Sequence, residues 1–130
     1  MTGETPSPPT PVSALAFGVA FLSVQAALAF EGRYVAGDKT YRQELSIAKR
    51  VDGRFDVTAV VGTEGCSGFV DAVGAAADGD TLKAEAKEDD ETCILVLRRT
   101  KTGVSLEEDA NCVYFHGASC EFTGDYRKRR

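Results

Sequence analysis

Four cysteines, Cys66, Cys93, Cys112 and Cys120, follow an apolar N-terminal segment and constrain the fold more than any other feature of the chain. An even number of cysteines in a small exported chain predicts two disulfides and an oxidising compartment. Four cysteines allow three connectivities. We predict Cys66–Cys93, which would join two strands around a hairpin, and Cys112–Cys120, which would close the loop of a last hairpin.

Residues 1–29 have the pattern of a signal peptide, since residues 12–30 carry no charge and are mostly Ala, Val, Leu and Phe. The segment ends in Ala27-Leu28-Ala29, a small-x-small pattern of the kind that signal peptidase cuts, and we predict cleavage after Ala29. The alternative is an uncleaved anchor, because the apolar run is close to the roughly 18 residues that span a bilayer. Cleavage would leave one domain, residues 30–130, in the periplasm or secreted.

The predicted domain is acidic, because it holds all 15 Lys and Arg residues but also 19 of the 20 Asp and Glu residues. Four of its basic residues form a C-terminal tail at 127–130, so the body is more negative still. An acidic body argues against nucleic acid as a partner and is compatible with a basic protein. We expect membrane contact, if any, only through the leader or the basic tail.

The domain shows the period-two alternation of short β-strands, in which one face is apolar and the other polar. Asp-Gly pairs at 52–53 and 78–79 are typical of hairpin turns. The composition of residues 82–87 favours a helix, but their alternation and the flanking turn signals indicate a strand. The alternating apolar residues include Leu45, Ile47, Phe55, Val57, Ala59, Val61, Leu82, Ala84, Ala86, Val104 and Leu106.

The C-terminal part is predicted to end in a hairpin formed by Cys112–Phe115 and Glu121–Tyr126, and acidic solvated loops are predicted at 88–91 and 107–109. Gly68 would mark a bulge in its strand, and Gly117 would supply a positive φ in the last turn. About seven or eight short strands in all predict an all-β fold, a small antiparallel β-barrel or sandwich with two disulfides, preceded by the signal helix.

Cys66-Ser67-Gly68, Cys93–Leu97 and the ending Tyr114-Phe115-His116-Gly117-Ala118-Ser119-Cys120 through Tyr126 form a recognisable set. Together they resemble a small exported bacterial β domain that is associated with periplasmic lysozyme-inhibitor-like proteins. Together with the acidic body, the resemblance implies a domain that binds another protein. It would cover residues 30–126.

His116 is the single histidine, and two kinds of chemistry could use it. A small hydrolase would need His116 beside Ser119 or an acid such as Asp125. A zinc site would use Cys112, His116 and Cys120, whose spacing would suit a helix, although Gly117 argues against a helix there. We expect neither, and no cofactor.

The hypothesis that follows is an exported, non-enzymatic binding module, with lysozyme or another basic cell-wall hydrolase as its partner. Its candidate partner-binding residues are Ser67, Tyr114, His116 and Ser119. The alternative is a structural or stress-related envelope protein that binds a lipid, a glycan or another envelope protein.

Overall fold

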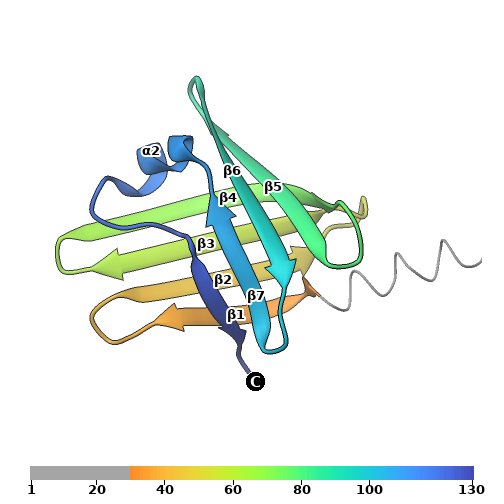
Figure 1. Ribbon diagram of the computed structural model, residues 1–130. Helices are drawn as coiled ribbons and strands as arrows, with labels where there is room; N and C mark the ends of the chain where they lie inside the picture. The colour runs from red at the N-terminus through yellow and green to blue at the C-terminus, as the bar shows by residue number, and fades with distance from the viewer. Residues whose placement is uncertain (1–29) are drawn as a thin grey trace, which may run out of the picture.

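Eight antiparallel strands close into a barrel in chain order, and the last strand pairs with the first (Figure 1). The computed structural model describes residues 30–130, so the predicted signal peptide and its cleavage site lie outside the described residues. The all-β prediction is confirmed, with the barrel rather than the sandwich. The strands are β1 (Gly32–Gly37), β2 (Arg42–Lys49), β3 (Phe55–Thr63), β4 (Cys66–Ala76), β5 (Thr81–Glu88), β6 (Glu91–Arg99), β7 (Gly103–Glu108) and β8 (Gly124–Lys128).

The alternation of the sequence maps directly onto the barrel wall. Leu45 of β2, Ala59 of β3 and Val70 of β4 stand opposite one another in the ladder, and all three point into the core. Every second residue of a strand faces the same side, so one apolar stripe per strand fills the interior. The helix-or-strand ambiguity at residues 82–87 resolves as strand, because Leu82, Ala84 and Ala86 are buried in β5.

The seam that closes the barrel uses one short motif twice, Phe-x-Gly-x-Tyr, at 30–34 and at 122–126. Both phenylalanines and both tyrosines are buried. Each tyrosine donates a 2.6 Å hydrogen bond to the carbonyl oxygen of the phenylalanine four residues before it. Burial raises the pKa of both phenols, so they stay protonated donors at neutral pH.

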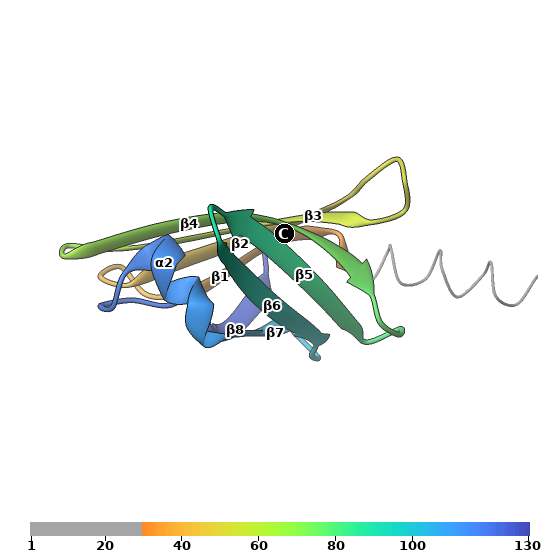
Figure 2. The same ribbon diagram turned by 90° about the horizontal axis from the view of Figure 1, so that it is seen from above.

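The predicted last hairpin is wrong, because Cys112–Phe115 is helical. After β7 the chain forms a 3₁₀ turn, η1 (Ala110–Cys112), and one turn of helix, α2 (Val113–His116). The helix ends at Gly117 with a φ of 82°, which confirms the positive φ predicted there. We call residues 109–123 the cap segment. It packs against β6 and β4 and leads into β8 (Figure 2).

No helix among residues 30–130 is long and apolar enough to cross a membrane.

Candidate functional site

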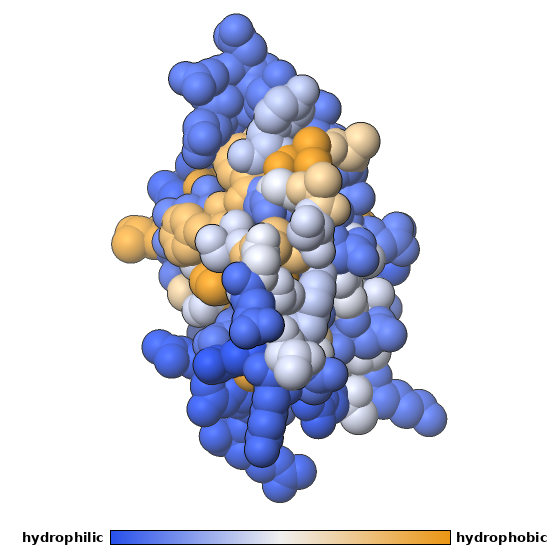
Figure 3. Space-filling model, turned by 90° about the vertical axis from the view of Figure 1, so that its left-hand side faces the viewer, coloured by the Kyte–Doolittle hydropathy of each residue, from blue (hydrophilic) through white to orange (hydrophobic). Residues whose placement is uncertain are grey.

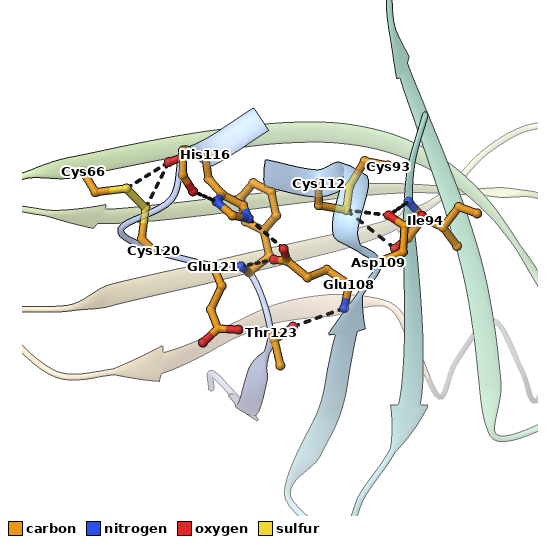
Figure 4. Close-up of polar contacts among 12 residues, drawn as sticks. Cys66, Cys93, Ile94, Glu108, Asp109, Cys112, His116, Cys120, Glu121 and Thr123 are labelled. Carbon is orange, nitrogen blue, oxygen red and sulfur yellow. Dashed lines mark hydrogen bonds and ion pairs between the residues drawn. A yellow bond between two sulfur atoms is a disulfide. The ribbon is translucent and has the colours of Figure 1, made fainter. Parts of the chain in front are cut away.

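The two disulfides attach the cap segment to the barrel wall. Cys66, at the start of β4, bonds to Cys120, and Cys93, in β6, bonds to Cys112 (Figure 4). The predicted pairing of Cys66 with Cys93 and of Cys112 with Cys120 is therefore wrong. It assumed that Cys112 and Cys120 face each other across a hairpin. Because η1 and α2 replace that hairpin, the two cysteines are carried to different strands.

A buried ion pair holds the middle of the cap segment. Nε2 of His116 lies 2.7 Å from Oε2 of Glu108, and these side chains are 4% and 11% exposed. Nδ1 of His116 lies 2.5 Å from the carbonyl oxygen of Gly117. Both ring nitrogens face oxygen atoms, so an N–H at either position has an acceptor. The ring also packs edge-on against Phe122, with 4.9 Å between centroids.

Glu108 ties three parts of the structure together from the end of β7. One carboxylate oxygen contacts His116, and the other accepts a 2.5 Å hydrogen bond from the backbone N–H of Phe122. The predicted solvated loop at 107–109 is therefore wrong for this residue, since Glu107 and Glu108 end β7 and Glu108 points inward against the cap segment.

Gly68 lets the cap segment approach β4 closely. A β-carbon placed there would lie 2.8 Å from the α-carbon of His116 and would overlap its β-carbon. The ladder runs through this position without interruption, with Gly68 opposite Val61, so the predicted bulge is wrong. The glycine serves close packing of one backbone against another.

Polar side chains from the start of β2 hold the far end of the cap segment. The buried amide of Gln43 donates to the carbonyl oxygens of Glu121 and Thr123, at 3.0 and 2.9 Å. The hydroxyl of Tyr41 accepts from the backbone N–H of Glu121 at 2.8 Å. The loop after Gly117 is thus fixed on both sides, and a loop held this way loses little entropy on binding.

Three of the four predicted partner-binding residues are exposed around the Cys66–Cys120 disulfide. Ser67 follows Cys66 and Ser119 precedes Cys120, so the bond brings them to one corner, while Tyr114 projects from α2 and is 63% exposed. His116 is 6% exposed, and its carbonyl oxygen lies 2.9 and 3.3 Å from the two sulfurs. His116 is therefore buried beneath the disulfide and is not part of the exposed surface.

Phe69 is exposed on the outer face of β4, the face turned away from α2, and sequence reasoning missed it. It lies two residues beyond Ser67 on the outer face of β4, is 58% exposed, and stands opposite the exposed Val60 of β3. We call Ser67, Phe69, Tyr114 and Ser119, which lie on the two sides of this end of β4, the corner surface. Seen from the side where the β1–β2 and β3–β4 turns project, hydrophobic atoms gather in the middle and hydrophilic atoms cover both ends (Figure 3).

Acidic side chains flank the corner surface. Glu64 lies in the turn before β4, Asp71 lies on β4 two residues past Phe69, and Glu121 follows Cys120. All three are exposed, and none forms an ion pair with another part of residues 30–130. Glu64 shares a surface hollow with Lys39 and Arg42, while Asp71 and Glu121 are the carboxylates nearest the corner that are open to a basic partner.

The geometry also bears on the two chemical alternatives. The sulfurs of Cys112 and Cys120 are engaged in different disulfides. Cys93, Asp109 and Cys112 also lie close together, but the two cysteines of this cluster are bonded to each other, so none of these sulfurs is a free thiolate for a metal. The ring nitrogens of His116 contact Gly117 and Glu108 instead of Ser119 or Asp125. Asp125 lies on β8, opposite Ser105 of β7.

Comparison with known proteins returns no relative: no family model, no curated protein and no solved structure matches the chain. A proposal for the function therefore rests on the geometry and charge of the residues described above.

Proposed function

We propose that this protein is an exported, non-enzymatic binding module that inhibits a basic cell-wall hydrolase of the lysozyme type. The observation that carries the proposal is the corner surface, two exposed aromatic residues and two serines on a backbone held by a disulfide and a buried ion pair. Exposed tyrosine and phenylalanine on a rigid backbone contribute much of the binding energy at protein interfaces.

The charge of the surroundings supports a basic partner. Asp71 and Glu121 lie nearest the corner and form no ion pair among residues 30–130. Carboxylates at the rim of an interface speed association with a basic enzyme, and salt screens this effect. The acidic domain and its resemblance to lysozyme-inhibitor-like domains point to the same class of partner.

Inhibition of a basic animal-type lysozyme by the oxidised protein tests the proposal. We expect inhibition that weakens as salt rises, and a Phe69→Ser or Tyr114→Ala change should raise the inhibition constant by about 30-fold, the effect of losing a hot-spot side chain. Val51→Ser is the matched control, because Val51 is fully exposed in the β2–β3 turn and should not matter. An absence of inhibition at micromolar protein would reject the lysozyme-type partner.

The second candidate is a structural or stress-related envelope protein that binds a lipid, a glycan or another envelope protein. The observation that favours it lies on a different surface, a group of basic side chains along the barrel seam. Fractionation distinguishes the two, since a protein that is recovered freely soluble after export would speak against an envelope role.

A further inference from the structure

Of the basic C-terminal residues, Arg127 and Lys128 belong to the barrel wall, and Arg129 is tied to it. Arg127 pairs with Val35 and Lys128 with Tyr34 in the β1–β8 ladder, and the backbone N–H of Arg129 donates to the carbonyl oxygen of Arg33 at 2.8 Å. Their backbone positions are therefore fixed, and their side chains are exposed along the seam. Because the backbone of β8 is paired on both sides, its charged side chains start from fixed positions.

Two adjoining hollows collect these charges. One, of about 580 Å³, lies along the outer side of the β1–β2 turn, and the other, of about 670 Å³, lies beside the β6–β7 turn. Arg127 and Arg129 line both. Together the linings hold eight basic residues and two acidic ones, Asp38 and Glu44; the basic residues are Lys39, Arg42, Arg99, Lys101, Arg127, Lys128, Arg129 and Arg130.

Most of this positive charge is not neutralised internally. Arg42 pairs with Glu44 and Arg99 with Asp80, while the other six basic residues have no ion-pair partner within residues 30–130. Hydrogen bonds from Thr40 and then Tyr41 lower the pKa of the Asp38 carboxyl, so that this residue keeps its charge as well. We call the eight residues the basic face. A net excess of cations on an acidic protein calls for an external anion.

The charge is also segregated along the molecule. The basic face lies at the end where the C-terminus emerges, and the acidic β5–β6 turn, Glu88 to Glu91, projects from the opposite end (Figure 1). The start of β1 lies beside the basic face, as the distance of 2.8 Å between a β-carbon placed on Gly32 and Cε of Lys128 shows. The acidic end would be repelled by an anionic surface while the basic end is attracted, which sets an orientation.

We propose that the basic face docks onto the anionic lipid head groups of a membrane surface. Its cations are spread over two open hollows instead of converging on one point, which fits many separate phosphates in a plane. The attraction of each Lys or Arg to such a surface is additive to a first approximation. The proposal rests on and deepens the second candidate function, and it is independent of the corner surface, which lies at the start of β4, on α2 and in the loop after α2.

Co-sedimentation of the full chain with vesicles tests the docking. The probes are phosphatidylcholine vesicles with and without about one third phosphatidylglycerol, and the readout is the ratio of the two affinities, in which any contribution from the leader cancels. We expect a preference for anionic vesicles that falls with salt. Replacing Lys101, Arg127 and Arg129 by Gln should reduce the preference by about a hundredfold, since each cation contributes about fivefold.

A matched variant separates the basic face from net charge. Lys83, Lys87 and Arg54 are exposed on β5 and in the β2–β3 turn, outside both hollows, and replacing them by Gln removes the same charge. This variant should keep the preference. An equal loss in both variants, no loss in either, or binding to soluble heparin without any preference for anionic vesicles would overturn the proposal.

Discussion

The barrel wall and the cap segment are stabilised in different ways. The wall buries apolar stripes from β2 to β7 and one tyrosine from each of β1 and β8, and its stability comes from removing that surface from water. The cap segment has no regular ladder of its own, and two disulfides, the Glu108–His116 pair and the Gln43 amide hold it in place. The wall would tolerate conservative apolar changes, whereas the cap segment depends on a few specific bonds.

Removing the disulfides one at a time should have the largest effect, and it tests whether the cap segment depends on these bonds. In the loop-entropy description, Cys66–Cys120, with a sequence separation of 54, contributes about 4 kcal/mol, and Cys93–Cys112, with a separation of 19, contributes about 3 kcal/mol. Urea unfolding of the two paired Cys→Ala variants should show losses in that order. Hydrogen exchange should speed up first in residues 113–123. Faster exchange throughout the wall at the same time would contradict the contrast.

Removing one partner of the buried ion pair should have the next largest effect. Glu108→Gln leaves His116 without its carboxylate and is expected to cost about 3 kcal/mol in the free energy of unfolding. Glu107→Gln is the control, because Glu107 is exposed and its 3.7 Å pair with Arg98 should contribute less than about 1 kcal/mol. Equal costs for the two variants would show that the buried pair does not hold the cap segment.

The close approach at Gly68 gives a smaller test of the same contact. Gly68→Ala would force α2 away from β4 and should cost about 2 kcal/mol, the usual effect of overpacking. Gly62→Ala on the neighbouring strand is the control, since a β-carbon there meets nothing within 4 Å. Thermal unfolding monitored by circular dichroism compares the two. An unchanged midpoint for Gly68→Ala would mean that the cap segment moves freely.

The tyrosines of the seam sharpen the comparison at high pH. Because burial raises the folded-state pKa of Tyr34 and Tyr126, their stabilising contribution is complete below the ordinary phenol pKa of about 10 and is lost as the pH rises above it. Tyr126→Phe removes the hydrogen bond to Phe122, costs about 1 kcal/mol at neutral pH and should flatten the alkaline loss of stability. Unfolding free energies measured between neutral and alkaline pH check this, and an equally steep alkaline loss in the variant would contradict it.

The sequence predicts the wall well because period two is a local signal. Leu45, Ile47 and Ala84 can be assigned to the core from their immediate neighbours, without knowing what they pack against. The hairpin turns at 52–53 and 78–79 are equally local. The closure of the barrel has one sequence signal, the Phe-x-Gly-x-Tyr motif that occurs at both 30–34 and 122–126.

The cap segment could not be predicted because its contacts join residues that are distant in sequence. Val113-Tyr114-Phe115 has the β-branched and aromatic composition of a strand, yet tertiary bonds at Cys112 and His116 impose a helical turn. Glu108 sits in a run of acidic residues that is typical of a solvated loop, and only the position of His116 shows that it is buried. The predicted disulfide pairing is wrong for the same reason, since each cysteine of the cap segment bonds to a distant strand.

Mapping the disulfides of the oxidised protein tests the account most directly, because the corner surface exists only if Cys120 is bonded to Cys66. Trypsin leaves Cys66, Cys93 and the Cys112/Cys120 pair on three peptides, 55–83, 88–98 and 102–127. Our account predicts one species of three linked peptides under non-reducing conditions. Further cleavage after Tyr114 or Phe115 should then separate a Cys93–Cys112 fragment from a Cys66–Cys120 fragment. Two tryptic species, with Cys66 linked to Cys93 and an internal bond between Cys112 and Cys120, would contradict it.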